Sequence, residues 1–502
     1  MNVHLMHPAR DVDLTSELPP EAEDLAQDLD IEAIVDAMSQ GDPHLRSMAE
    51  RALLTGLTDV AAIRYRQDVL RDCLAQPEAI RRLYALATDV TVGHRRIHGL
   101  FFFARSPESV LARSLDLLEF FSERLRELRR LTSDFAPQVR SQGLGQLCAT
   151  ARTELDDAYF ATVAAELREL RFANGIHLSA GLGPGCKPDA WVLHRWPAGR
   201  RGRWRPRILG TGRDVYAFEI PERDESGLQA LADLRGRSVS SVANVLAQSA
   251  DHILGFFACL RSELGFYVGC LNLHDALVRA GAAPVMPEPC AGGGRLCAKD
   301  LRDAALTLRT GGEVVPNDLA ADGTVLVMIT GANQGGKSTF LRGVGLALVM
   351  LRAGMFVAAA SFAADVPQGV FTHFKRQEDA NLESGKFEEE LARLSAIVDR
   401  VRPGSVILCN ESLAATSERE GSEIARQVVR GLGEAGVRVL FVTHLFDLAD
   451  SLYRDGGRTG KALFLRADRG EDGRRTFRLR EGAPQPTSHG EDLYRSIFGA
   501  DA

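Results

Sequence analysis

Gly331-Ala332-Asn333-Gln334-Gly335-Gly336-Lys337-Ser338-Thr339 directly follows the apolar run Val325-Leu326-Val327-Met328-Ile329. The run predicts a buried strand, and the periodic apolar residues after the glycines predict a helix that begins near Lys337. Backbone N–H groups of a glycine-rich turn and the positive end of a helix together bind phosphate. The sequence therefore predicts a nucleotide phosphate loop, in which Lys337 contacts the β and γ phosphates and Ser338 ligates Mg²⁺. The alternative is an ordinary glycine turn.

A second apolar run, residues 406–409, ends in Asn410 and Glu411. In P-loop proteins such a strand end is where the residue that organises Mg²⁺ and a catalytic carboxylate are found. Asn410 is therefore the candidate for the metal site, and Glu411 the candidate general base that orients or deprotonates the attacking water. The alternative for Glu411 is a solvated carboxylate at a strand end.

A third apolar run, residues 439–443, ends in His444. A histidine at the end of a strand near the phosphate loop can hydrogen-bond the γ-phosphate or the attacking water. We therefore expect His444 to take part in hydrolysis. The alternative is a purely structural histidine.

The composition is that of an ordinary globular protein with room for two to four domains. The chain has 502 residues, a net charge of −7 and 45% hydrophobic residues, so a nucleic-acid contact needs a local basic patch. Its eight cysteines form no C-x-x-C pair, which favours reduced thiols of a cytoplasmic protein. No secretory signal is seen, and Arg261 and Glu263 interrupt the most apolar stretch, so we expect no membrane span.

The hydrophobic pattern changes along the chain and divides it into regions. Residues 1–30 are acidic and contain proline, which predicts a mobile tail. Residues 31–283 show helical spacing, interrupted over about 174–222 by short extended runs that predict a small β-rich insertion. From 284 to 502 strands and helices alternate, which predicts a sheet covered by helices.

Several segments of the C-terminal region resemble the ATPase domain of the MutS family, whose members are dimeric, ABC-type DNA-repair ATPases. The segments are 329–339, Asn381-Leu382-Glu383-Ser384-Gly385-Lys386-Phe387, 410–411, 441–444, 314–319, and 487–490 with 497–499. The resemblance is specific over about 300–500, and residues 63–70 are similar to the family's core region. It implies an α/β P-loop (ABC-type) ATPase domain preceded by a mainly α-helical core and lever region with a clamp-like β-rich insertion.

The resemblance also implies ATP and Mg²⁺ as cofactors and a homodimer that forms through the ATPase domain. Ser384 and Gly385 precede a predicted amphipathic helix, whose positive N-terminal end can face an ATP bound to the partner subunit. The alternative is that Ser384 only caps this helix.

Three departures from the family pattern affect the predicted site. Asn410 stands where the family has aspartate, which removes one negative charge near Mg²⁺ and predicts slow hydrolysis. Ala414 and Ala415 stand where the family usually has Arg-Gly, and Val314 replaces an aromatic residue that often stacks on adenine. Neither the family's mismatch-reading domain nor its Phe-x-Glu wedge is visible, so we expect no autonomous mismatch recognition.

The β-rich insertion carries a cluster of arginines with two tryptophans. Guanidinium groups pair with phosphates, and indole rings stack on bases. Four arginines are the candidate nucleic-acid contacts: Arg200, Arg201, Arg203 and Arg205. The alternative is a solvated loop, or one that pairs with the acidic N-terminal residues.

The sequence thus predicts a MutS-like ATPase that couples ATP binding and hydrolysis to closure of a dimer on duplex or branched DNA, in repair or recombination. A second hypothesis is a nucleotide-gated scaffold with little hydrolysis that acts through protein partners, which Asn410 favours. A third, a small-molecule kinase, is disfavoured by the segment around Ser384.

Overall fold

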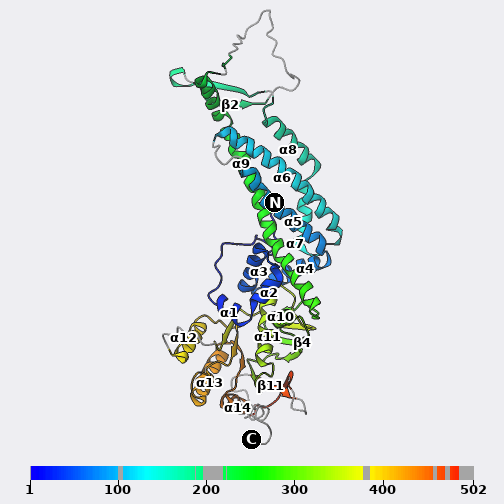
Figure 1. The fold of residues 1–502 in the computed structure, drawn as a ribbon, viewed down its shortest axis with the longest axis vertical. Coiled ribbons are helices and arrows are strands. Elements are labelled where there is room, and N and C mark those ends of the chain that lie inside the picture. The colour runs from blue at the N-terminus through cyan, green and yellow to red at the C-terminus, as the bar shows by residue number, and fades with distance from the viewer. Residues whose placement is uncertain are drawn as a thin grey trace, which may run out of the picture. The chain divides into compact units, whose positions relative to one another are not determined.

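The computed structural model describes residues 2–99, 106–173, 175–186, 188–195, 219–221, 223–376, 385–455, 461–469 and 475–485. The chain divides into two compact units. Unit 1 comprises Met1–Val3, Glu78–Val139 and Leu144–Arg261, and unit 2 comprises His4–Pro77, Arg140–Gly143 and Ser262–Ala502. Figure 1 shows the elements of both, coloured along the chain.

Unit 1 is built of long helices and one hairpin. Its elements are α5 (Pro77–Gly99), α6 (Pro107–Phe135), η1 (Ala136–Gln138), α7 (Gln142–Glu154), α8 (Asp157–Leu170), β1 (His177–Leu182), η2 (Pro184–Cys186), β2 (Pro188–His194) and the first part of α9 (Glu225–Arg279). Ser106 and Asp156 cap the N-termini of α6 and α8 with their side chains, as these residue types do at helix starts. The strands β1 and β2 pair antiparallel within the region where the sequence predicts a β-rich insertion.

The helix α9 is long and apolar enough to be a candidate membrane span by length and composition. However, 61% of its most apolar window is buried inside the structure. Core helices pass the same test, so this is weak evidence for a membrane span. The burial agrees with the expectation that residues 253–271 form a core helix.

Unit 2 contains two sheets covered by helices. Its helices are α1 (Ala22–Asp28), α2 (Ile31–Ser39), α3 (Pro43–Thr55), α4 (Val60–Ala75), the second part of α9, α10 (Ala304–Thr310), α11 (Lys337–Arg352), α12 (Lys386–Val398), α13 (Glu418–Glu434) and α14 (Phe446–Arg454). The six-stranded sheet has the order β12 (Arg475–Glu481), β11 (Ala462–Arg469), β6 (Leu326–Thr330), β10 (Arg438–Val442), β9 (Val406–Asn410), β8 (Val370–Phe374). The four-stranded sheet has the order β3 (Glu288–Cys290), β7 (Ser361–Asp365), β4 (Leu296–Leu301), β5 (Asn317–Ala320).

The six-stranded sheet is parallel except for β12, which runs antiparallel to β11. The central strands β6 and β10 are almost entirely buried, as expected for strands with helices on both faces. In the register, Val442 of β10 pairs with both Ile329 of β6 and Asn410 of β9. The carboxyl ends of β6, β9 and β10 therefore meet at one edge, where ligands bind in open α/β sheets.

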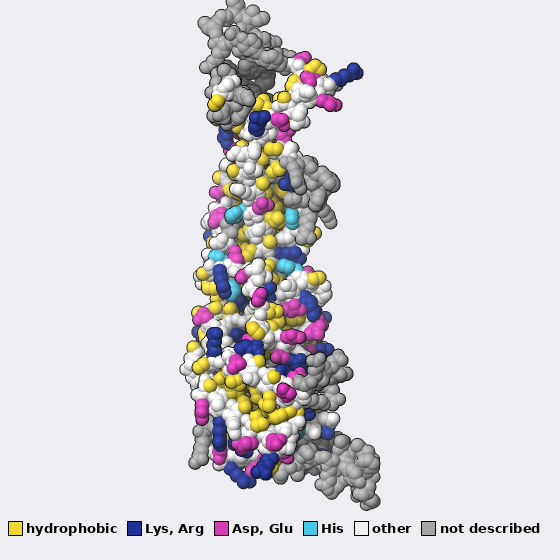
Figure 2. Space-filling model, turned by 90° about the vertical axis from the view of Figure 1, so that its left-hand side faces the viewer, with side chains coloured by type: hydrophobic (Ala, Val, Ile, Leu, Met, Phe, Trp, Pro, Cys, Tyr) yellow, Lys and Arg dark blue, Asp and Glu magenta, His cyan; other side chains and the backbone are white. Residues whose placement is uncertain are grey.

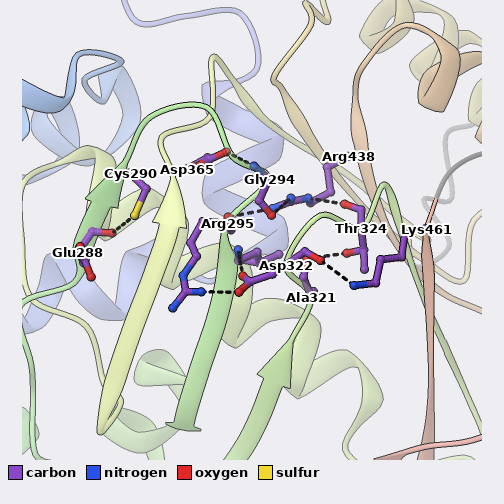
Figure 3. Close-up of polar contacts among 11 residues, drawn as sticks. Glu288, Cys290, Gly294, Arg295, Ala321, Asp322, Thr324, Asp365, Arg438 and Lys461 are labelled. Carbon is purple, nitrogen blue, oxygen red and sulfur yellow. Dashed lines mark hydrogen bonds and ion pairs between the residues drawn. The ribbon is translucent and has the colours of Figure 1, made fainter.

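Arg438, at the start of β10, joins this sheet to the loop that precedes β4 (Figure 3). Its guanidinium donates to the carbonyl oxygens of Thr324 at 2.9 Å, Gly294 at 2.6 Å and Arg295 at 3.2 Å. From β7, Asp365 accepts the backbone N–H of Gly294 at 2.7 Å. These contacts connect the two sheets at the amino end of β10, opposite the edge where ligands bind.

The N-terminal residues differ from the expected mobile tail. Leu5 and Met6 are buried, and residues 22–28 form α1, which packs against β8. Two of the acidic side chains that predicted disorder have partners in the α/β region: Asp24 pairs with Arg376 and, at 3.6 Å, with Arg393, and Glu21 pairs with Arg400 at 3.8 Å. Pairing removes the like-charge repulsion on which the expectation depended.

The compact units also cut across the boundary expected near residue 283. Residues 4–77 group with the α/β region. The helices α1, α2 and α3 pack against β8, α10 and α11, and polar side chains of α4 bond to the backbone of this region. Arg66 donates to the carbonyl oxygen of Ala353 at 3.1 Å, and Gln67 to that of Pro287 at 2.9 Å. Contacts between distant chain segments are not visible in hydrophobic periodicity.

Candidate functional site

Two glycines shape the turn between β6 and α11. Gly331 has a φ of +111° and Gly336 a φ of +88°, values that disfavour residues with a side chain. A Cβ atom at Gly331 would lie 2.9 Å from the backbone nitrogen of Ala467 on β11, closer than carbon and nitrogen can approach. Gly336 is the N-cap of α11 and provides no side-chain cap. The N-terminal amides of α11 are therefore not engaged by a capping side chain.

Lys337 lies at the first position of α11 and bends back over the loop. Its ammonium donates to the carbonyl oxygens of Gly331 at 2.7 Å and Ala332 at 2.9 Å. Burial lowers the pKa of Lys337 to about 8, and the charge of Glu411 partly opposes this shift. A phosphate in the loop would supply an anionic partner, since no carboxylate of the described residues forms an ion pair with this ammonium.

Ser338 and Asn410 lie side by side although they belong to different elements. The Ser338 hydroxyl donates to Oδ1 of Asn410 at 2.8 Å. Both are neutral oxygen donors of the kind that bind Mg²⁺ directly or through its waters. The pair therefore fits a magnesium ion, with one negative charge fewer than a serine and aspartate pair would supply.

Glu411 and His444, treated as separate candidates in the sequence, form one pair. Nε2 of His444 lies 2.9 Å from Oε1 of Glu411. The hydrogen bond from His444 is the main cause of a lowered pKa of Glu411, and the charges of His444, Lys337 and Lys375 add to it. Glu411 has a φ of +54°, which is uncommon for a side-chain-bearing residue and often found at functional sites.

A cavity of about 460 Å³ opens at the phosphate loop. Its walls come from the loop and α11, from α10 and the residues before β5, and from β12. They are Leu301, Arg302, Asp303, Leu306, Thr310, Gly312, Glu313, Val314, Val315, Asn317, residues 333–340, Gly343, Glu411 and Phe477. The volume falls within the range of small-molecule sites, roughly 300–1,000 Å³.

Sequence reasoning missed Phe477. The residue is 46% exposed although it lines this cavity, and its backbone φ is +58°. Asn317 holds the strand in place: its amide nitrogen donates to the carbonyl oxygen of Phe477 at 3.1 Å, and its Oδ1 accepts from the backbone N–H of Leu479 at 2.7 Å. The cavity that Val314 lines therefore contains an aromatic residue supplied by β12. In the sequence, the only signal for an edge strand here is the polar–apolar alternation of Thr476-Phe477-Arg478.

The segment expected to face a partner subunit is only partly visible. Ser384 lies outside the described residues. Gly385 is exposed and is the N-cap residue of α12.

The candidate nucleic-acid contacts Arg200, Arg201, Arg203 and Arg205 also lie outside the described residues. Arg195, at the start of this arginine cluster, pairs with Glu166 and, at 3.5 Å, with Glu169 of α8. On the face shown in Figure 2, basic and acidic side chains are interspersed rather than gathered by sign.

Two family models match separate parts of the chain. The MutS2 N-terminal domain matches residues 58–280, and MutS domain V matches residues 327–459. The chain carries two domains of the MutS family. The resemblance expected from the sequence is thereby confirmed, and the MutS domain V match contains the phosphate loop, Asn410, Glu411 and His444.

Curated relatives agree with these matches. The chain is 32% identical to the DNA mismatch repair protein MutS of Methanococcoides burtonii over 256 residues, covering 49% of this chain and 28% of that protein. It is 31% identical to the Thermus aquaticus MutS, covering 48% and 29%. With the DNA mismatch repair protein MutS 2 of Halobacterium salinarum the identity is 31%, covering 54% and 30%. The chain thus spans less than a third of the length of these MutS-family relatives.

Proposed function

We propose that this chain is a MutS-like ATPase that binds Mg²⁺-ATP in the cavity at the phosphate loop and hydrolyses it. The observation that carries the proposal is the meeting of two polar pairs at one sheet edge: Ser338 with Asn410, and Glu411 with His444. Lys337, next to Ser338 in the chain, is buried, and within the described residues its ammonium forms no ion pair but donates to loop carbonyl oxygens. The MutS domain V match supports it.

In this proposal the residues have separate tasks. The backbone amides of residues 331–339 hold the phosphates, and the Lys337 ammonium moves from the loop carbonyls to the β and γ phosphates. Ser338 and Asn410 would hold Mg²⁺, which neutralises charge that develops on the phosphates. Glu411, kept anionic by its lowered pKa, orients the attacking water and accepts its proton, while His444 positions Glu411.

The base of the nucleotide would stack on Phe477. Val314 cannot provide an aromatic surface, whereas the exposed ring of Phe477 lines the same cavity. Stacking of a base on an aromatic side chain contributes roughly 1–3 kcal/mol to binding.

ATP binding would close a homodimer on DNA, with residues 384–385 of one subunit against the ATP of the other. The names of the relatives, DNA mismatch repair proteins, support a DNA substrate and a role in repair. Recombination is the alternative role in this proposal, and the cytoplasm is the proposed location. Arg200, Arg201, Arg203 and Arg205 remain the proposed DNA contacts.

A second candidate is a nucleotide-gated scaffold with little hydrolysis that acts through protein partners. Asn410 favours it, because a neutral amide organises Mg²⁺ less strongly than a carboxylate does. The Glu411–His444 pair favours hydrolysis instead, since a scaffold that only binds ATP has no need of a general base.

ATPase turnover with no DNA, duplex, mismatched and branched DNA tests the proposal and separates the candidates. We expect turnover that requires Lys337 and Glu411 and rises with a preferred DNA. ATP binding with turnover equal in the wild type and Glu411→Gln would favour the scaffold. Unchanged nucleotide affinity in Lys337→Ala would refute the nucleotide site itself.

A further inference from the structure

A second hollow of about 200 Å³ lies in unit 2, apart from the residues that line the nucleotide cavity. The N-terminal segment, the C-terminal half of α3 and α4 enclose it. Its walls are Met6, His7, Arg10, Val12, Asp13, Ser16, Met48, Arg51, Ala52, Thr55, Gly56, Leu57 and Arg66. In Figure 1 the helices α2 and α3 lie near α10 and α11, and α3 packs against α11.

Three arginines reach this hollow from three different elements. Arg10 comes from the N-terminal segment, Arg51 from α3 and Arg66 from α4. Arg51 donates to the side-chain oxygen of Ser16 at 3.0 Å, which fixes the guanidinium at the wall. Guanidinium groups from several directions around one small space are the geometry that holds a tetrahedral oxyanion.

Arg66 is the least exposed of the three, with 3% of its surface accessible. Its donors reach the carbonyl oxygens of Met6 and Ala353, and one nitrogen lies 3.5 Å from Nε2 of His7. Within the described part of the chain, no carboxylate forms an ion pair with it. The guanidinium also lies over the ring of Phe266, 5.4 Å from its centroid. Because burial of a charge without an ion-pair partner is costly, a buried guanidinium at a cavity wall favours an anion there.

The remaining titratable groups leave the hollow positive. Burial and the charges of Arg66 and Arg10 lower the pKa of His7 to about 4, so that His7 is neutral near pH 7. Asp13 is the acidic residue of the lining. The carboxylate of Glu263 is engaged by the backbone N–H groups of Leu5, Met6 and Val12. The charged groups of the lining are thus three arginines and one carboxylate, together with the partial negative charge at the C-terminal end of α3.

We infer that this hollow binds a phosphate group, and we name it the Arg10–Arg51–Arg66 site. Its volume holds on the order of six water molecules, which is room for one phosphate with some water and too little for a whole nucleotide. The phosphate can belong to a DNA strand or be free in solution. The chemistry that recognises it is the same in both cases.

The test uses the full chain carrying Lys337→Ala, so that the phosphate loop does not contribute. Calorimetric titration with inorganic phosphate at constant ionic strength should show one saturable equivalent. Arg10→Ala together with Arg51→Ala should weaken this binding at least about tenfold, because each removes charge-assisted hydrogen bonds. Arg66 is left intact, since its removal could unfold the chain. The matched control is Arg46→Ala. Arg46 lies on α3, the helix that also carries Arg51, and it pairs with Asp36 instead of lining the hollow.

Competition identifies the source of the phosphate. Displacement of inorganic phosphate by a duplex without 5′-phosphates assigns the site to the DNA backbone, and displacement only by the 5′-phosphorylated duplex assigns it to DNA ends. Displacement by neither assigns it to a free anion. Absence of saturable phosphate binding, or equal affinity in the double variant and the Arg46→Ala control, would overturn the inference. Neither result bears on ATP binding at the phosphate loop.

Discussion

Nε2 of His444 lies 2.9 Å from Oε1 of Glu411, across the carboxyl ends of two adjacent parallel strands. The hydrogen bond fixes the carboxylate toward the phosphate loop and keeps it ionised, as the lowered pKa of Glu411 indicates. Bound nucleotide would place its γ-phosphate beside this pair.

Glu411→Gln should retain ATP binding and lose turnover. The amide keeps the size of the side chain but cannot accept the proton of the attacking water, and loss of a general base typically costs about 10² to 10⁴ in rate. Single-turnover hydrolysis and equilibrium binding of ATP measure the two effects. The surface variant Glu423→Gln, on α13, is the control and should hydrolyse ATP at the wild-type rate.

Asn410→Asp should raise turnover. The added carboxylate lies within 2.8 Å of the Ser338 hydroxyl and restores the negative charge that organises Mg²⁺. Turnover measured over a Mg²⁺ series should reach half its maximum at a lower Mg²⁺ concentration than in the wild type. Identical Mg²⁺ curves for both proteins would show that Asn410 does not limit metal binding.

ATP affinity should fall as the pH rises above about 8. Burial lowers the pKa of Lys337 to about 8 in the free protein, and bound phosphates raise it again by favouring the charged ammonium. Below pH 8 the ammonium is charged in both states, so the affinity is constant there. Above pH 8 binding must take up a proton, and the affinity falls by up to about tenfold per pH unit. Calorimetry in buffers of different ionisation enthalpy detects this proton uptake, which Lys337→Arg should abolish because arginine stays charged.

Phe477→Ala should weaken ATP binding roughly tenfold or more and leave tripolyphosphate binding unchanged. The variant removes a stacking surface for the base but no phosphate contact. Phe477→Tyr keeps the ring and is the control. Equal losses for ATP and tripolyphosphate would mean that Phe477 shapes the loop through Gly336, near which its backbone lies, rather than contacting the base.

Replacement of Arg200, Arg201, Arg203 and Arg205 by Ala should weaken binding to all DNA sequences alike. The log-log salt dependence should flatten by roughly 0.9 for each lost phosphate contact on duplex DNA. Fluorescence anisotropy over a salt series measures the slope, while ATP affinity should stay constant. An unchanged slope would remove these arginines from the DNA-binding surface.

Local patterns were sufficient to predict the strand, loop and helix around the phosphate loop. The apolar run before Gly331 forms β6, and α11 begins at Lys337, as the sequence predicts. Likewise, Asn410 is the last residue of β9 and Glu411 follows it, and His444 comes after β10. These features depend on residues that are neighbours in the chain, so periodicity and glycine positions were informative.

Tertiary structure decided which of these residues meet. The parallel register of β6, β10 and β9 brings Glu411 to His444 and Ser338 to Asn410, and β12 brings Phe477 to the cavity from more than a hundred residues away. Tertiary structure also decided the order of the acidic N-terminal residues. The sequence predicted a mobile tail there, whereas the fold places Arg376 and Arg393 beside Asp24. The sequence by itself determined the local elements and the MutS resemblance, because both follow from short segments. Only the folded chain determined the pairs, the cavity and the Arg10–Arg51–Arg66 site, because charge pairing and burial depend on contacts between segments that are distant in sequence.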